Sequence, residues 1–359
     1  MSLTPRRRVI AALNREEPDR VPFELFLGLS PSLLETFVAR TGHLDPAEYW
    51  SAPVRSVAHR PPPAFALWRT YADYYPEQLP AGTSISAFGV AQSYGSAQHF
   101  VRKLCPLRDA TRVEEAVDYP LPDPMDPARY AHLEAATRAL HGRDLAVQGE
   151  LYVTIFETAW AIRGFEEMLA DLVLRPDFAQ ALFDRLTEPR VVQARQLAEA
   201  GVDVLRLGDD VASQTGMLIS PALWRRWFKP RMARIIDTAR AVKPDIHIFY
   251  HSDGDCRDIV PDLIEIGVTV LNPVQPECMD PAALKREYGD RLAFWGTVGT
   301  QTTMPRGTPE EVRAVVRERI ETVGKGGGLL ISPTHTLEPD VPWENLVAFV
   351  EAVEELGRY

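Results

Sequence analysis

The sequence predicts an α/β protein in which one (β/α)8 barrel, a TIM barrel, forms a single domain over residues 1–359. From about residue 145 onward, short apolar runs alternate with longer amphipathic ones, and this alternation is typical of a parallel sheet with right-handed crossovers. Two earlier apolar runs bring the strand count to eight, which favours a closed barrel. No glycine-rich dinucleotide fingerprint follows any of these runs, so an open doubly wound sheet is less favoured.

The predicted strands are short runs with β-branched or aromatic content. Six lie in the second part of the chain, at 145–151, 202–208, 246–252, 268–274, 292–298 and 328–334. The segment 21–26 is expected to begin the barrel, and 85–90 is the best candidate for the remaining strand. The N-terminal 130 residues are less regular, and we expect irregular excursions there that partly cover the barrel mouth.

Helices are predicted between these strands, at 175–200, 221–243, 309–323 and 343–357. Ser220 is a suitable N-cap because Pro221 follows it at the first helical position. Thr308 precedes Pro309, and Glu311 stands three residues after the cap, which is the spacing of a capping box.

Charge and cysteine content narrow the class of protein. The net charge of −11 argues against a nucleic-acid or anionic-membrane partner, since both require basic surfaces. The three cysteines form no CxxC pair, so a reducing, cytoplasmic location is expected. The basic N-terminus lacks the apolar region of a signal peptide, and no apolar run reaches the roughly 20 residues that span a bilayer.

Polar residues follow five successive predicted strands. Because the carboxyl ends of barrel strands meet at one mouth, these residues predict an active site there. They are Asp209 and Asp210, then His251, Ser252 and Asp253, then Asn272 and Gln275, then Thr297, Thr300 and Gln301, and finally Ser332, Thr334 and His335.

His251 and Asp253 form the most informative pair. Residues i and i+2 of a strand point to the same side, so the imidazole and the carboxylate could share a metal, or the carboxylate could orient the imidazole. With His335 they are the predicted metal ligands, a set that suits catalytic zinc or a facial-triad iron. The alternative is that all three only make hydrogen bonds and cap helices.

Three carboxylates are the predicted catalytic groups. Asp209 and Asp210 either ligate a metal or grip a cationic group, or they cap the following segment. Glu157 lies in an apolar run, and a buried carboxylate needs a partner. It is therefore either functional or paired with an arginine such as Arg163.

Four residues are the predicted substrate contacts: Arg206, Asn272, Gln275 and Trp160. An arginine within an apolar barrel strand would bind an anion or a carboxylate, although a salt bridge to Asp209 or Asp210 is the alternative. Trp160 belongs to a residue type that lies more often in the core than at a ligand.

Several long segments resemble the uroporphyrinogen decarboxylase superfamily. They are RVIAALNREEPDRVPF (8–23), GDDVASQTGMLISPALWRRWFKPR (208–231), YHSDGDCRDIVPDLIEIGVTVLNPVQ (250–275), LKREYGDRLAFWGTV (284–298) and GGGLLISPTHTLEPDVPWENL (326–346). The resemblance implies an enzyme with the same barrel fold, often a homodimer.

One branch of this superfamily decarboxylates uroporphyrinogen III in porphyrin biosynthesis, without a cofactor. Its members carry an arginine-rich segment after the first strand, and the matching stretch here, FELFLGLSPSLL (23–34), contains no arginine. The family's early-strand aspartate falls at Ser86, and its site tyrosine falls near Trp160. These departures count against a polyanionic porphyrinogen substrate.

The sequence also resembles the other branch, the methyltransferases that move methyl groups between small substrates or thiols and a corrinoid protein. Their zinc motif, His-x-Cys-Gly with a later cysteine, corresponds here to His251-Ser252-Asp253-Gly254 and His335. This harder ligand set suits polarisation of an oxygen more than activation of a thiol. The resemblance therefore implies a zinc-dependent methyltransferase with a small methylated substrate and a corrinoid protein as partner.

Two alternatives stay open. The first is decarboxylation of uroporphyrinogen III or of another carboxylated substrate, in which Arg206 and His335 would bind carboxylates or donate protons. The second is a barrel that binds a ligand without catalysis, which the many polar strand ends favour least.

Overall fold

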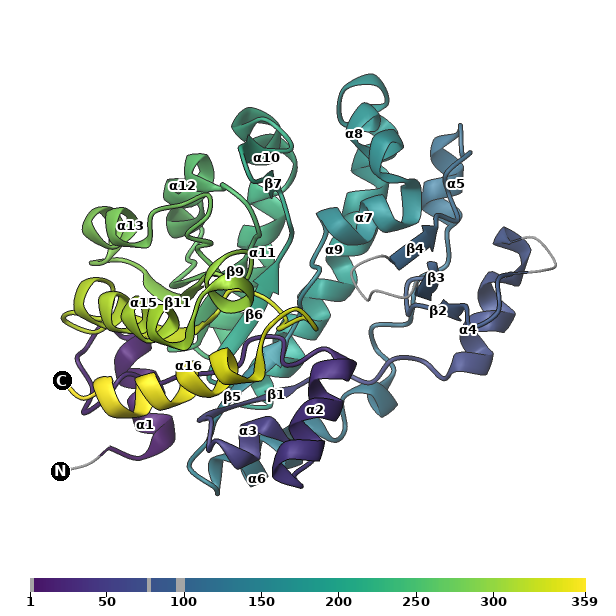
Figure 1. Ribbon diagram of the computed structural model, residues 1–359. Coiled ribbons are helices and arrows are strands. Elements are labelled where there is room, and N and C mark those ends of the chain that lie inside the picture. The colour runs from purple at the N-terminus through teal and green to yellow at the C-terminus, as the bar shows by residue number, and fades with distance from the viewer. Residues whose placement is uncertain (1–2, 76–78, 95–100) are drawn as a thin grey trace.

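Seven parallel strands form a curled central sheet with helices packed outside it (Figure 1). The computed structural model describes residues 3–75, 79–94 and 101–359. The strand order is β1-β5-β6-β9-β10-β11-β12, and every neighbouring pair is parallel. These strands are β1 (Val54–Val57), β5 (Ala146–Glu150), β6 (Val204–Gly208), β9 (His247–His251), β10 (Val270–Asn272), β11 (Ala293–Val298) and β12 (Leu329–Pro333).

The predicted first strand, 21–26, lies beside β12 as an extended segment. Phe23 forms an isolated parallel bridge with Ile331, and Ile331 N donates to Pro22 O at 3.0 Å. Pro22 has no N–H to donate, which limits the ladder that this segment can form. Within the described residues no β-bridge joins the segment to β1, so the hydrogen-bonded sheet itself is a curled half-barrel.

The prediction of a barrel strand at 85–90 is wrong. β2 (Ser84–Ile85) ends there, Gly89 N donates to Ser86 O in a turn, and the chain returns antiparallel as β3 (Ala91–Tyr94). With β4 (Val101–Leu104) these strands make a separate antiparallel sheet. The central strand that the sequence did not reveal is β1, whose middle residues are Arg55 and Ser56. It therefore lacks the continuous apolar run that marks the other central strands.

Three predicted helices are confirmed as α9 (Pro176–Glu199), α15 (Pro309–Thr322) and α16 (Trp343–Leu356). The capping box at Thr308 and Glu311 forms in both directions. The region 221–243 instead divides into α10 (Pro221–Trp227), capped by Ser220, and α11 (Lys229–Val242), which has Pro230 in its first turn. A proline favours that position because it has no N–H to donate there.

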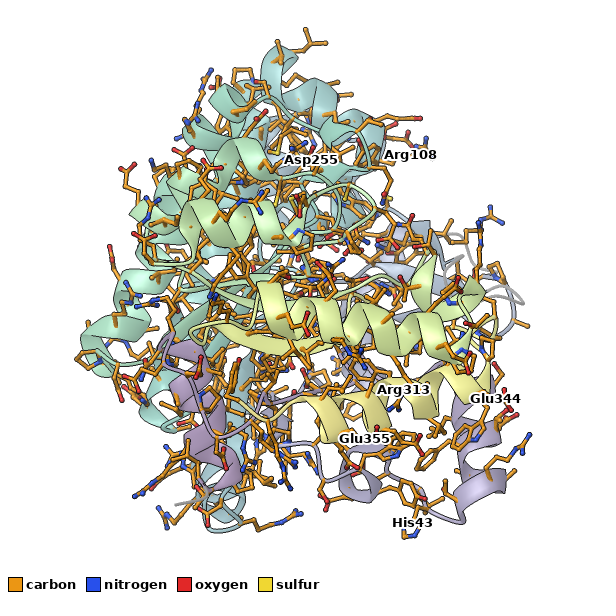
Figure 2. All side chains as sticks on the ribbon, turned by 60° about the vertical axis from the view of Figure 1, so that its left-hand side comes forward. His43, Arg108, Asp255, Arg313, Glu344 and Glu355 are labelled. Atoms are coloured by element: carbon orange, nitrogen blue, oxygen red, sulfur yellow. The ribbon has the colours of Figure 1, made fainter. Side chains whose placement is uncertain are left out.

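The remaining α-helices and strands each have 11 residues or fewer. They are α1 (Pro5–Leu13), α2 (Pro31–Thr41), α3 (Pro46–Tyr49), α4 (Ala64–Tyr71), α5 (Val113–Asp118), α6 (Leu133–His141), α7 (Phe156–Arg163), α8 (Phe165–Leu174), α12 (Val260–Glu265), α13 (Pro281–Tyr288), α14 (Thr303–Arg306), β7 (Ala212–Ser213) and β8 (Gly216–Met217). Helices α15 and α16 pack side by side, and Arg313 pairs with Glu355 between them (Figure 2). None of the described helices has the length and apolarity needed to cross a membrane.

An apolar cluster fills one end of the sheet interior. Its members come from seven strands, from α1 and from the 21–26 segment: Val9, Leu13, Phe26, Val54, Ala146, Val204, Phe249, Val270, Ala293, Trp295 and Leu330. Further along the same strands the inward positions become polar, at Ser56 and Gln148 for example, whose side chains are hydrogen-bonded to each other. The interior is thus sealed by apolar packing at one end, and its polar groups are directed toward the other.

Candidate metal centre and active site

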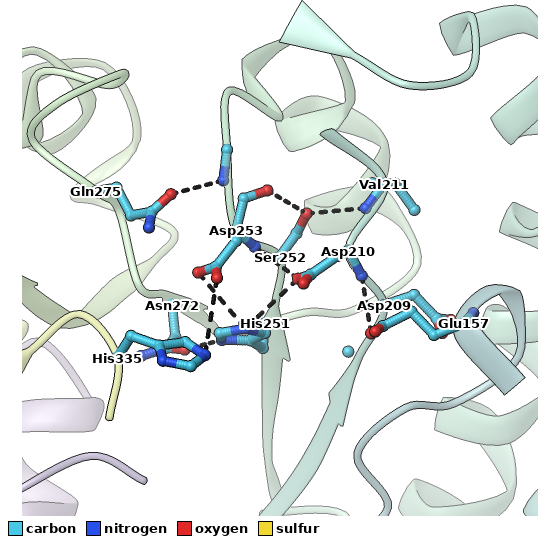
Figure 3. A network of polar contacts seen from close by, with 12 residues as sticks. Glu157, Asp209, Asp210, Val211, His251, Ser252, Asp253, Asn272, Gln275 and His335 are labelled. Atoms are coloured by element: carbon cyan, nitrogen blue, oxygen red, sulfur yellow. Dashed lines mark hydrogen bonds and ion pairs between the residues drawn. The ribbon is translucent and has the colours of Figure 1, made fainter. Parts of the chain in front are cut away.

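Three ligand-type side chains meet at the carboxyl ends of β6 and β9 (Figure 3). Nε2 of His251 lies 3.5 Å from Oδ1 of Asp210 and 3.7 Å from Oδ1 of Asp253. One ligand atom from each residue lies within 4.8 Å of the other two. His335 approaches from beyond β12, with Nε2 3.9 Å from Oδ2 of Asp253. The predicted ligands His251, Asp253 and His335 therefore lie together, and Asp210, predicted as catalytic, joins them as a fourth candidate.

The orientation of the His251 imidazole is fixed by Asn272. The Asn272 amide donates from Nδ2 to Trp295 O at 2.7 Å, so its Oδ1 faces Nδ1 of His251 at 2.5 Å. Nδ1 must therefore carry the hydrogen, which leaves the lone pair of Nε2 directed at the two carboxylates. Burial lowers the pKa of His251, so the neutral imidazole is favoured. Ligating histidines commonly donate their other N–H to an oxygen in this way.

The cluster contains buried polar atoms that lack hydrogen-bond partners among the described residues. Nε2 of His251 and Oδ1 of Asp253 are both in this state. Buried polar atoms are rarely left unpaired. Burial raises the pKa of Asp253 well above its usual range, and the neighbouring Asp210 raises it further. A divalent cation would satisfy these atoms, and imidazole nitrogen with carboxylate oxygens is a donor set that zinc accepts.

Asp209 and Asp210 are neighbours with separate contacts. Oδ2 of Asp209 accepts from Ile155 N at 2.9 Å, and Oδ1 accepts from Glu157 N at 3.0 Å, at the start of α7. Burial raises the pKa of Asp209 to about 6, although these backbone donors oppose the shift. Asp209 thus caps the N-terminus of α7, a helix that precedes it in the chain. It does not cap the segment that follows it, which was one of the predicted alternatives.

Glu157, in the first turn of α7, faces the cluster. Its Oε2 accepts from Asp210 N at 3.0 Å. Burial raises its pKa well above the usual range, and the nearby Asp210 and Asp209 add to the rise. Arg163 is not its partner, because that guanidinium pairs with Asp171 at 2.7 Å. Burial and these two carboxylates therefore favour the protonated form of Glu157 beside the candidate metal centre.

Trp160 lies one turn further along α7. Nζ of Lys103, on β4, stands 3.9 Å from the centre of its ring. Phe165 packs edge-on against the same ring at 5.8 Å. The structure thus places the predicted substrate contact Trp160 beneath a lysine that the sequence did not single out.

Gln275 supports the loop that follows β9. Its Oε1 accepts from Gly254 N at 2.7 Å, and Ser252 Oγ accepts from Val211 N at 3.2 Å. Gly254 has φ 82°, and a Cβ there would come within 2.5 Å of Ser213 O. Only glycine fits this position without strain. These contacts hold Asp253 against Asp210, whose Oδ1 accepts from Asp253 N at 2.8 Å.

A cleft of about 590 Å³ opens beside the cluster. It is lined by Asp210, Asp253, Gln275, Thr300, Gln301, His335, Thr336, Glu338, Pro339 and Asp340. The cleft is large enough for a small molecule and brings it into contact with three of the four candidate ligands.

Arg206 lies inside the sheet, next to the cluster. Nη1 of Arg206 is 3.1 Å from both oxygens of Glu150. A salt bridge therefore forms with Glu150, and not with Asp209 or Asp210, the partners named in the alternative to anion binding. The rings of Phe26 and Tyr152 lie 4.6 and 4.7 Å from its Cζ. Tyr152 was not among the predicted site residues, although it stands two residues beyond the end of β5, as Asp253 does beyond β9.

The fold and this cluster define an α/β protein with a polar, acidic site at the carboxyl ends of its parallel strands. The sequence matches the uroporphyrinogen decarboxylase (URO-D) family over residues 81–356, and the chain belongs to this family of enzymes.

Two curated relatives carry the names of two different activities. The methylcobamide:CoM methyltransferase MtaA of Methanosarcina barkeri is 29% identical over 178 residues, covering 50% of this chain and 49% of the relative. The uroporphyrinogen decarboxylase of Coxiella burnetii is 24% identical over 196 residues, covering 52% and 50%. The chain thus spans about half the length of the curated relatives it matches.

Among solved structures, a methyltransferase from Methanosarcina mazei superposes with a TM-score of 0.70 and covers 99% of both chains. At 18% sequence identity this likeness shows a shared fold and nothing further.

Proposed function

We propose that this protein is a zinc-dependent methyltransferase, built as one (β/α)8-barrel domain, that moves a methyl group from a small methylated substrate to a corrinoid carried by a partner protein. The observation that carries the proposal is that two buried ligand atoms, Nε2 of His251 and Oδ1 of Asp253, have no hydrogen-bond partner among the described residues. The methyltransferase relatives support it.

The metal would be held by His251, Asp253 and Asp210, with His335 as the further candidate. Two carboxylates would balance the charge of a divalent ion. Bound zinc supplies Lewis acidity that polarises the atom carrying the methyl group. Because the donors are nitrogen and oxygen, we propose a methyl–oxygen bond as the bond that is broken.

We propose the following roles for the side chains around the metal. Asn272 holds the imidazole in the tautomer that directs Nε2 at the cluster. The raised pKa of Glu157 favours its protonated form, which can deliver a proton to the oxygen that loses its methyl group. Gln275 fixes the loop that carries Asp253. We propose that Trp160, with Lys103 beside its ring, contacts the substrate on the α7 side. We propose that the N-terminal segments around β2–β4 are the excursions that partly cover the mouth.

The wider setting of the enzyme is also a proposal. A cytoplasmic location is supported by the three free cysteines. A homodimer is supported by the family resemblance alone.

Decarboxylation of a carboxylated substrate is the second candidate. It is favoured by the buried guanidinium of Arg206 and by the decarboxylases among the relatives. The lack of arginine in 23–34 makes a porphyrinogen the less favoured substrate.

The test is the zinc content of protein purified without a metal-chelating resin. We expect about one zinc per chain in the wild type, and its loss in His251→Ala. His247→Ala is the matched control, because His247 is buried on the same strand but lies outside the cluster. Methyl ethers would then be screened with a reduced corrinoid as acceptor. A wild-type protein without metal would refute the proposal and direct the search to carboxylated substrates.

A further inference from the structure

We propose that the unpaired edge of the Arg206 guanidinium binds a carboxylate of the substrate, which makes the methyl donor an acidic molecule. The identity of the bound molecule as methyl donor rests on the proposed function. The binding of a carboxylate at Arg206 does not, and it can be measured separately.

The unpaired edge is formed by Nε and Nη2. Arg206 is 5% exposed, Nη1 is bonded to Glu150, and Nε and Nη2 are buried without a hydrogen-bond partner in the part of the chain that the structure describes. Two buried donors left unpaired on a charged group are costly. A bound carboxylate would satisfy both at once.

This chain already uses the same edge to bind carboxylates elsewhere. Arg8 donates from Nε and Nη2 to the two oxygens of Asp19 at 2.7 and 2.9 Å. Arg257 binds Asp255 in the same way, at 2.8 and 2.5 Å. The geometry of two parallel N–H donors matches a planar carboxylate. At Arg206 the donors are present, but no carboxylate of the described residues is hydrogen-bonded to them.

The guanidinium is held ready for such a ligand. The Phe26 and Tyr152 rings near its Cζ help fix its position, and the bond to Glu150 fixes its rotation. Phe26 is buried, whereas Tyr152 is partly exposed, so we expect Tyr152 to move when a ligand enters.

The same two rings connect this subsite to the candidate metal centre. The ring centres of Phe26 and Tyr152 lie 5.5 and 5.2 Å from that of His251. A carboxylate bound to Arg206 would therefore be separated from the candidate metal centre by a single layer of aromatic rings. A small substrate could reach both places, with its acid group on Arg206 and its methylated atom beside His251.

The surrounding layer is polar and reached by solvent. Ser56 is exposed and donates to Oε1 of Glu150 at 2.7 Å, and Oε1 of Gln148 is a buried acceptor without a partner among the described residues. Because Glu150 shares the single positive charge of Arg206, it competes with an incoming carboxylate. Removal of Glu150 should therefore strengthen binding, whereas removal of Arg206 should weaken it.

The experiment compares Arg206 and Glu150, two neighbouring residues whose substitution should change the affinity for acids in opposite directions. The full-length protein would be titrated calorimetrically with benzoate, phenylacetate and hexanoate, each against its uncharged amide. We expect at least one acid to bind the wild type more tightly than its amide, about tenfold weaker binding in Arg206→Met, and tighter binding in Glu150→Gln. Arg313→Met is the control, since it breaks the Arg313–Glu355 pair between α15 and α16 (Figure 2). It should bind the acids as the wild type does.

If Arg206→Met does not fold, the double variant Arg206→Met/Glu150→Gln removes both charges together and should still lose acid binding. Equal binding of acids and amides by the wild type, or undiminished acid binding without Arg206, would overturn the inference. Zinc would be measured in the same samples. Zinc without acid binding overturns this inference alone, and Arg206-dependent acid binding without zinc overturns the proposed function alone.

Discussion

The substitution Asn272→Ala tests whether the orientation of His251 controls metal binding. Asn272 is 1% exposed and makes two buried hydrogen bonds, to Nδ1 of His251 and to Trp295 O. The alanine leaves both partners unpaired, at about 1–3 kcal/mol each, so we expect the free energy of unfolding to fall by about 2–6 kcal/mol. Loss of an oxygen that orients a ligating histidine typically weakens metal affinity by about 10–100-fold.

The matched control for this change is Asn345→Ala. Asn345 is also 1% exposed and also makes two hydrogen bonds on the side of α16 that faces α14, a buried one to Met304 O and a partly buried one to Gly307 O. Both variants should lose similar stability in urea titrations, but only Asn272→Ala should release zinc to a competing chelator at lower chelator concentration. Equal zinc affinities in the two variants would show that the tautomer argument for His251 is wrong.

Two further predictions concern stability. Burial raises the pKa of Glu24 to about 7. The folded state therefore binds more protons than the unfolded state between about pH 4.5 and 7. The stability that this group contributes is lost as the pH rises through that window. Glu24→Gln keeps an acceptor for Trp295 Nε1. Between pH 5 and 8, the free energy of unfolding of this variant, measured in urea titrations, should rise by up to about 3 kcal/mol relative to that of the wild type. Parallel curves of stability against pH would contradict this. Thr308→Ala removes the capping box of α15 and should lower the free energy of unfolding by about 1 kcal/mol in the same assay. Thr322→Ala, at the other end of that helix, is the control and should cost less. Equal losses in the two variants would count against the cap.

The strands that the sequence revealed are those with continuous apolar runs. β6 and β11 are buried along their whole length, and parallel strands buried on both faces are recognisable for that reason. β1 has Arg55 and Ser56 at its centre, so apolar pattern could not identify it. The run at 85–90 is apolar because it packs around a turn of the small sheet, a tertiary context that local sequence does not encode.

The site could be predicted in outline, because polar residues at successive strand ends must meet. His251 and Asp253 were found by their spacing, and the structure brings them together. The separate roles of Asp209 and Asp210 could not be read from the doublet, because only the position of α7 decides which carboxylate meets a helix terminus. Tyr152 was missed because a tyrosine after a strand resembles a core residue until its neighbours are known.

The apolar cluster at one end of the sheet has a consequence for how this fold diversifies. The contacts among Val54, Val204, Phe249 and Leu330 are made before each strand reaches its polar end. Residues such as Asp253 and His335 stand outside that packing, so their exchange during evolution need not disturb it. A descendant can therefore replace its ligand set and its substrate contacts while inheriting the same foldable strands. One scaffold can in this way be shared by relatives that carry the names of methyltransferases and of decarboxylases.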